Sequence, residues 1–364
     1  MTHGSQIPTT VSRYIGTVLL LLCAARVTAR DPAERMGVTQ PAAPREVRFE
    51  SGNVMLAGLL RVPGSPGPCP AVVLLGGSLP TAKEDERLAT VAAAFVARGF
   101  AVLTTDSRGT GASQGEFDTT SLEQLAGDAA AAAAMLRQRA DVRVDAVGFW
   151  GVSQGATWVG PLAAERGDAA FLVAVSGPLV SPEVHVHRFL AGRLRSDHGL
   201  DDATVERVTK ARHVLWDYYA TGQGYEMANA AVDALRKEPW FGSSGLPPTV
   251  TVPSQLAGLP ERTRTFLAQK DFDPLAAIGR LRCPLLAVYG AQDTQLPVDE
   301  YAETLRTLGL RAIAGINVEV LQGLDHDLRP ALGGPTDPNT GDPFEVMARW
   351  ALAQVTGQEA RGAT

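Results

Sequence analysis

Short apolar runs that alternate with helical patterns are the feature that most constrains how this chain folds. Strands buried on both faces of a parallel sheet are continuously apolar, whereas strands with one exposed face alternate polar and apolar residues. Because helical segments separate most of these runs, the sequence predicts an α/β fold with a doubly wound, mostly parallel sheet. The runs lie at residues 71–75, 100–103, 146–150, 171–175 and 284–290, and each leads into a turn rich in glycine, serine or aspartate.

Capping and turn signals predict the remaining elements of the core. Thr120 and Glu123 form a capping box for an alanine-rich helix that ends near Arg139. Gly99 stands where helices end in the left-handed conformation. The other expected elements are a hairpin over residues 45–50 and 54–62, helices over 83–98, 298–309 and 342–355, and a last strand over 316–321.

The alternation stops between residues 181 and 270. Asp202 can cap a helix there, and the rest is broken by proline and glycine and rich in aromatic side chains, namely Trp216, Tyr218, Tyr225, Trp240 and Phe241. We expect an inserted, mainly helical cap over the strand ends; a separate interaction module is the alternative. The expected division is a signal peptide at 1–29, a flexible N-terminal segment at 30–44, the first part of the α/β core at 45–180, the helical cap at 181–271 and the second part of the core at 272–364.

The first residues carry an export pattern. Arg13 precedes an apolar run over residues 14–25, and small residues near Ala29 suit a signal peptidase. The run is shorter than the roughly 20 residues that span a bilayer. We therefore expect cleavage near Ala29, a secreted or periplasmic protein, and no stable membrane anchor after cleavage. A misassigned start codon would instead leave the protein in the cytoplasm.

Composition and cysteine spacing argue against nucleic-acid binding and against a cysteine-based zinc site. The net charge of −6 is spread without long blocks of one sign, so nucleic-acid binding is not expected. The chain lacks the cysteine–histidine spacing of a zinc site. After signal cleavage, Cys69 and Cys283 remain at the starts of expected strands that are not neighbours. We therefore expect free, buried thiols. The sequence leaves the oligomeric state open.

The turn after the run at 146–150 carries the strongest chemical signal. Its sequence, Gly151-Val152-Ser153-Gln154-Gly155, matches the pattern Gly-x-Ser-x-Gly. A serine on a sharp strand-to-helix turn holds strained backbone angles, and the flanking glycines let the chain segments approach closely. The following helix aims its free N–H groups at charge that develops beside the serine. Ser153 is therefore the candidate nucleophile.

A serine hydroxyl needs an adjacent base to activate it. His326 lies in a Gly/Asp loop directly after the last expected strand, at the sheet edge where Ser153 should lie. It is therefore the candidate base. The other histidines of the mature chain fall in the expected cap, where solvated or packing roles are expected; they are His185, His187, His198 and His213.

The base must in turn be oriented by an acid. Asp293 directly follows the run at 284–290 and is the candidate. Asp325 and Asp327 adjoin His326 too closely in sequence to reach its far ring nitrogen. The remaining competitors are Asp271, Asp273 and Asp299.

Two preorganised N–H donors are needed for the oxyanion of a tetrahedral intermediate. The backbone N–H of Gln154, directly after the serine, is one. The second is expected from the loop after residues 71–75, with the Ser78 N–H first and the Leu79 N–H as the alternative. Asp106 and Arg108 are expected to brace the neighbouring loop and to take no part in the chemistry.

These motifs resemble the α/β-hydrolase superfamily, in which the order Ser153, Asp293, His326 is expected. The match is closest to bacterial serine esterases related to prolyl-oligopeptidase and serine-aminopeptidase hydrolases. It covers residues 45–178 and 272–357. Gly76 stands where the family commonly has histidine, and Leu79 where it has glycine. The motifs are G-V-S-Q-G, D-S-R-G-T-G-A-S, F-D-P, Y-G-A-Q-D-T-Q-L-P and G-L-D-H.

The resemblance implies a serine hydrolase without cofactor or metal, which cleaves a small-molecule carboxylic ester through an acyl-enzyme. A peptidase or acyl thioesterase on the same triad is the alternative. An aminopeptidase would hold a free amine with acidic cap residues such as Glu183, Glu206 or Glu226. Haloalkane dehalogenation would need aspartate at position 153. A non-catalytic binding protein on a hydrolase scaffold is the alternative from another class.

Overall fold

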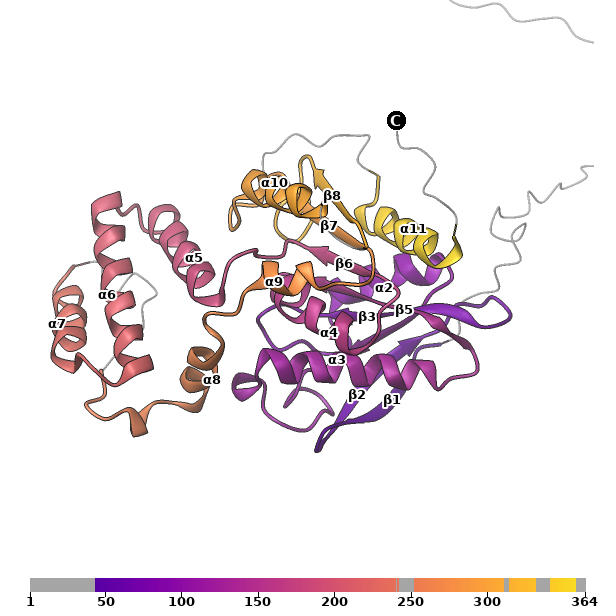
Figure 1. The fold of residues 1–364 in the computed structure, drawn as a ribbon, viewed down its shortest axis with the longest axis horizontal. Coiled ribbons are helices and arrows are strands. Elements are labelled where there is room, and N and C mark those ends of the chain that lie inside the picture. The colour runs from indigo at the N-terminus through magenta and orange to yellow at the C-terminus, as the bar shows by residue number, and fades with distance from the viewer. Residues whose placement is uncertain (1–42, 240, 242–251, 311–313, 332–340, 358–364) are drawn as a thin grey trace, which may run out of the picture. The chain divides into compact units, whose positions relative to one another are not determined.

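The computed structural model describes residues 43–239, 241, 252–310, 314–331 and 341–357 (Figure 1). The predicted signal peptide lies outside the described residues, and so do Trp240 and the predicted flexible segment up to residue 42. Within the described ranges, no helix is long and apolar enough to cross a membrane.

The described strands form one eight-stranded sheet in the order β1-β2-β4-β3-β5-β6-β7-β8. β1 pairs antiparallel with β2, and β2 pairs antiparallel with β4. The other five pairs of neighbours are parallel. The doubly wound, mostly parallel sheet is therefore confirmed. The strands are β1 (Arg45–Ser51), β2 (Val54–Arg61), β3 (Cys69–Leu75), β4 (Ala101–Thr105), β5 (Val142–Val152), β6 (Leu172–Val175), β7 (Leu285–Gly290) and β8 (Ile316–Leu321).

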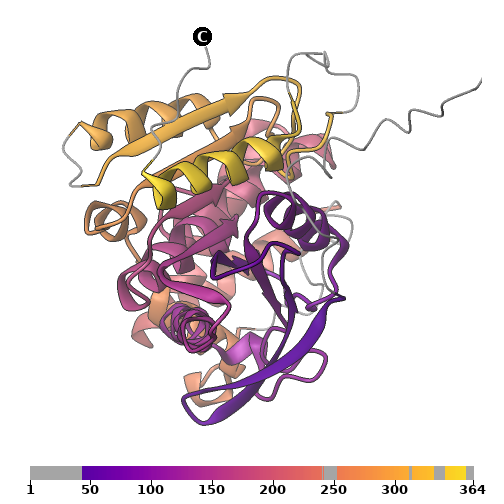
Figure 2. The same ribbon diagram turned by 90° about the vertical axis from the view of Figure 1, so that its right-hand side faces the viewer.

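Helices cover both faces of this sheet, which explains why its central strands are apolar throughout (Figure 2). On β3, Val73 packs into one buried cluster with helices α3 (Leu122–Arg137) and α4 (Gly160–Arg166). Val72, the preceding residue, packs into the other cluster with α2 (Glu86–Ala97) and α11 (Pro343–Thr356). The short helix α9 (Pro274–Gly279) and α10 (Val298–Gly309) also contribute to the first cluster.

The stretch between β6 and α9 is mainly helical, as predicted (Figure 1). Its helices bury two small apolar clusters of their own, around Leu194 and around Tyr218. The boundaries of the cap at residues 181 and 271 stay predictions. The helices are α5 (Pro182–Ser196), α6 (Asp202–Thr221), α7 (Tyr225–Arg236) and α8 (Glu261–Gln269), with a 3-10 turn at Leu256–Gly258.

Two predicted caps are wrong by one residue. Ser121 and Gln124 form the capping box of α3, with bonds of 3.2 and 2.9 Å, because the Thr120 hydroxyl instead donates to the Glu116 carbonyl. Asp201, not Asp202, caps α6, and it accepts the Thr204 N–H at 2.8 Å.

The helix expected from residue 83 also begins later, at Glu86, with Asp85 as its cap. Lys83 lies in the preceding loop, where its backbone N–H and ammonium both reach the buried carboxylate of Asp106, at 2.8 and 3.3 Å. The Glu84 carboxylate, 2.8 Å from the ammonium, and after it the Asp106 carboxylate raise the pKa of Lys83 above its usual value. Lys83 therefore belongs to the loop that Asp106 holds, and Asp85 begins the helix.

Candidate active site

Ser153 lies on the sharp turn that the sequence predicts at the end of β5. Its φ of 53° is in the left-handed region that non-glycine residues rarely adopt. A Cβ on Gly151 would lie 2.2 Å from the Gly155 carbonyl oxygen, and one on Gly155 would lie 2.2 Å from the Gly76 oxygen. Only glycine therefore fits at either position. The chain continues through a π-helical turn, Gly155–Val159, into α4.

Asp293 and His326 form a hydrogen-bonded pair. The Asp293 Oδ2 lies 2.7 Å from Nδ1 of His326, and the Asp293 side chain is fully buried. The other oxygen, Oδ1, accepts the backbone N–H groups of Gln295 and Leu296 at 2.7 and 3.2 Å. Because both carboxylate oxygens are hydrogen-bonded, the acid is fixed in place and orients the imidazole through its Nδ1 atom.

Close packing of two loops produces this pair. Asp293 follows β7 and His326 follows β8, which is its parallel neighbour. A Cβ on Gly290 would lie 2.2 Å from the Asp325 carbonyl oxygen, so only glycine lets the end of β7 approach the histidine loop. The Gln292 N–H donates to the Leu324 carbonyl at 2.9 Å and joins the two loops.

The other aspartates considered as the acid of the triad contact groups other than His326 or lie elsewhere. Asp325 accepts the N–H groups of Asp327 and Arg329 and so closes the histidine loop on itself. Asp273 caps α9, and Asp271 binds Lys270 at 2.9 Å. Asp299 lies in the first turn of α10.

Ser153 opens onto a cavity of about 320 Å³ between the core and the cap. Among the described residues, the Ser153 hydroxyl has no hydrogen bond to His326, and His326 does not line this cavity. Catalytic hydrogen bonds are often long in enzymes without substrate. The aromatic part of the wall consists of Trp158, Phe189 and Phe266.

Of the cap aromatics that the sequence singled out, those that the structure describes do not line this cavity. Trp216 packs against His187 and Phe266, and Tyr218 packs against Tyr225. Phe241 lies in one of the cap's own apolar clusters. These side chains therefore stabilise the cap, while other aromatic residues face the cavity.

The expected oxyanion donors lie beside the serine. Gln154 and Ser78 both line the cavity, whereas Leu79 does not. In the described part of the chain, none of these three backbone N–H groups donates to a protein acceptor. A Cβ on Gly77 would lie 3.6 Å from Cβ of Ser153, so this loop passes directly beside the nucleophile. The roles of Gln154, Ser78 and Leu79 stay predictions.

Neighbouring residues hold this loop in position. Thr81 accepts the Ser107 N–H at 2.8 Å, and its own N–H donates to the Ser107 hydroxyl at 2.9 Å. The Thr81 hydroxyl fills the space beside Gly76, where an added Cβ would lie 2.3 Å away. The threonine therefore occupies the room that the histidine common in the family would need.

Asp106 and Arg108 brace the neighbouring loops, as predicted. Asp106 binds Lys83 and also accepts the Ala112 N–H at 2.9 Å. Arg108 forms two hydrogen bonds of 2.8 Å with Asp128 on α3. Cys69 and Cys283 are free and buried, which confirms the expected thiols.

His185 is the site residue that sequence reasoning missed. It lines the cavity with Ser153, and its ring meets Trp158 edge-on at 5.5 Å. Burial, and after it the nearby His326, lower the pKa of His185 to about 4. Pro182, His185 and Phe189 recur at helical spacing, and this signal could have indicated a face turned to the cavity.

Comparison with known proteins identifies the family to which the chain belongs. The model of the family described as X-Pro dipeptidyl-peptidase (S15 family) matches residues 52–311, more than half of the chain. No curated protein matches.

Solved structures share the fold at low sequence identity. Est1E from Butyrivibrio proteoclasticus, solved with ferulic acid bound, is 17% identical, with 86% of this chain and 100% of that chain covered and a TM-score of 0.52. An esterase from Pyrococcus furiosus is 17% identical, with 83% and 88% covered and a TM-score of 0.52. The α/β hydrolase GrgF from a Penicillium species is 19% identical, with 87% and 99% covered and a TM-score of 0.53.

These likenesses confirm the α/β-hydrolase fold that the sequence motifs resemble. With its family model matched over more than half of its length, the chain belongs to the S15 family of α/β-hydrolase-type enzymes and is a hydrolase.

Proposed function

We propose that this hydrolase cleaves carboxylic esters through an acyl-enzyme formed on Ser153. The observation that carries the proposal is the strained turn that presents Ser153 to a cavity, with the hydrogen-bonded pair of Asp293 and His326 following the adjacent strands. Strain at a single non-glycine residue persists where the surrounding structure enforces it, which is typical of catalytic sites.

The reaction follows from the roles of these groups. His326 takes the proton of the Ser153 hydroxyl as the oxygen attacks the ester carbonyl. The N–H groups of Gln154 and of Ser78 or Leu79 stabilise the oxyanion. His326 then protonates the leaving alcohol, and the same base activates the water that hydrolyses the acyl-enzyme. Asp293 holds the imidazole in the tautomer that can accept the serine proton.

The cavity supports an ester over a substrate with a free amine. In the described part of the chain, no carboxylate lines it, and its aromatic wall suits an apolar acyl or alcohol group. Of the acidic cap residues that might hold an amine, Glu183 is bound by Lys270 at 2.8 Å and Glu206 by Lys210 at 2.8 Å. The third, Glu226, lies in the first turn of α7 and does not line the cavity.

A peptidase is the second candidate, because the matching family is described by a dipeptidyl-peptidase activity. A peptidase of this type needs an anionic group to bind the amino terminus of its substrate. That group would be either Glu183, once Lys270 has moved away from it, or a residue outside the described lining of the cavity. A thioesterase would use the same serine and cavity.

A substrate panel separates these functions. Wild type and Ser153→Ala are assayed with p-nitrophenyl esters of different acyl length, methyl ferulate, acyl-CoA, and dipeptidyl and aminoacyl anilides. We expect kcat/KM to be highest for esters with apolar or aromatic acyl groups and to be lost in Ser153→Ala. Faster turnover of the anilides than of every ester would overturn the ester proposal in favour of the peptidase.

A further inference from the structure

Three metal-binding side chains converge in the cap, away from Ser153. Glu183 and His187 are one helical turn apart on α5, and His213 comes from α6. The Glu183 Oε1 lies 3.4 Å from Nδ1 of His213 and 3.9 Å from Nε2 of His187. One ligand atom from each residue lies within 4.8 Å of the other two. The cluster therefore joins two helices at a single point.

His187 is the member of this cluster that protein contacts leave unexplained. The residue is only 5% exposed, yet neither ring nitrogen has a hydrogen-bond partner among the described residues. Its ring stacks on that of His213 with centroids 4.0 Å apart. A buried polar group without a hydrogen-bond partner destabilises the folded state. A metal ion that accepts the lone pair of one ring nitrogen would satisfy that nitrogen.

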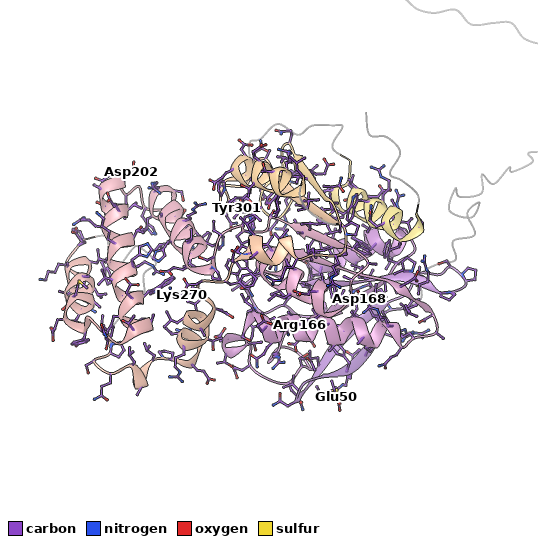
Figure 3. The ribbon with its side chains drawn as sticks, in the orientation of Figure 1. Glu50, Arg166, Asp168, Asp202, Lys270 and Tyr301 are labelled. Atoms are coloured by element: carbon purple, nitrogen blue, oxygen red, sulfur yellow. The ribbon has the colours of Figure 1, made fainter. Side chains whose placement is uncertain are left out.

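The carboxylate of Glu183 is oriented toward the histidines. Its other oxygen, Oε2, binds the ammonium of Lys270 at 2.8 Å, which leaves Oε1 on the histidine side. Lys270 follows α8, and its carbonyl accepts the Glu183 N–H at 3.0 Å, so it lies against the first turn of α5 (Figure 3). Asp271 also binds Lys270, at 2.9 Å, and offsets part of its positive charge. Outer groups that fix a ligand in this way are typical of metal sites.

We propose that Glu183, His187 and His213 bind a zinc ion, with water completing its coordination. Two imidazole nitrogens and one carboxylate are a frequent zinc ligand set. Tetrahedral zinc with bonds of about 2.0–2.1 Å places neighbouring ligand atoms about 3.4 Å apart. The Glu183–His213 distance of 3.4 Å already has this value, and the Glu183–His187 distance of 3.9 Å approaches it.

The ion would fix one wall of the substrate cavity. His185 and Phe189 lie on the same helix as Glu183 and His187, and both line the cavity. Zinc would crosslink α5 to α6 and so hold the His185 and Phe189 side chains in place at the cavity onto which Ser153 opens. The site has a structural role in the cap and is independent of the proposed ester hydrolysis.

The test measures zinc binding by the tag-free full chain after treatment with a chelator. Equilibrium dialysis with zinc chloride is expected to give a single saturable zinc ion per chain, and zinc is expected to raise the Tm. His213→Ala and Glu183→Gln are each expected to weaken binding at least about tenfold. His213 is half-exposed, with 49% of its side chain accessible, so its removal costs the stacking contact with His187 but disturbs the cap less than removal of the buried His187 would. His198→Ala, in the same cap, is the matched control.

Cobalt(II) provides a readout that a loss of side-chain packing alone would not change. Bound in place of zinc, it is expected to show the visible absorption of a four-coordinate ion in wild type and in His198→Ala, and to lose it in His213→Ala. The proposal is overturned if wild type binds no zinc saturably, or if either His213→Ala or Glu183→Gln keeps the wild-type affinity.

Discussion

The Asp293→Asn variant tests the proposed tautomer control of His326. The Oδ1 atom of Asp293 accepts two backbone N–H groups, from Gln295 and Leu296, while Oδ2 faces Nδ1 of His326. In the variant, the amide oxygen must stay on the side of the two N–H groups. The amide NH₂ then faces Nδ1 and forces the ring proton onto Nε2. The imidazole can no longer accept the proton of Ser153.

The magnitude follows from this change of tautomer. In a well-studied serine protease, the equivalent change lowers kcat about 10⁴-fold. At about 1.36 kcal/mol for each factor of ten, this corresponds to about 5.4 kcal/mol of lost transition-state stabilisation. Because the amide oxygen still satisfies both N–H groups, we expect the Tm to change little.

The assay compares kcat and KM on the best ester of the panel at pH 8. We expect kcat to fall by at least about 10³-fold while KM stays near the wild-type value. Asp273→Asn is the matched control, since Asp273 caps α9 and an asparagine caps equally well. If Asp293→Asn keeps kcat within tenfold of wild type, Asp293 is not the acid of the triad.

Three further perturbations test other parts of the structure. Gly151→Ala places a Cβ 2.2 Å from a backbone oxygen, and thermal unfolding is expected to show a Tm at least about 6 °C below that of wild type. The control is Gly279→Ala, where the added carbon has open space around it and the Tm is expected to stay unchanged. Cys69 and Cys283 are expected to resist iodoacetamide at pH 8 until the protein is denatured, because burial raises the pKa of both thiols, that of Cys283 to about 11; peptide mapping that finds either thiol modified in the native protein would contradict their burial. His185→Ala enlarges the cavity and is expected to raise the ratio of kcat/KM for bulky acyl esters to kcat/KM for small ones. If this ratio equals that of wild type and of the control His198→Ala, His185 does not contact the substrate.

The sheet could be predicted from the sequence because burial on both faces leaves a strong pattern. Val72 and Val73 point to opposite faces of β3, and both are buried, so the strand is apolar throughout. Asp293 and His326 were predictable for a related reason. Each directly follows a core strand, and parallel strands bring their carboxyl ends to the same edge of the sheet.

The cap could not be predicted in the same detail, because no sheet edge fixes the direction of its helices. His185 faces the substrate cavity and His187, two residues later, faces α6, and this difference depends on how α5 packs. The proximity of His213 to Glu183 likewise arises only from the contact between two helices. The one-residue error at Thr120 has a local cause, since both Thr120 and Ser121 satisfy the capping pattern and only the bond to Glu116 distinguishes them.

Labelling with a fluorophosphonate probe tests the central claim most directly, because the probe reacts with an activated serine and needs no knowledge of the substrate. We expect modification of wild type to map by mass spectrometry to Ser153, and to be absent in Ser153→Ala and His326→Ala. Robust labelling of Ser153→Ala, or an unmodified Ser153 in active wild type, would contradict the assignment of Ser153 as the nucleophile.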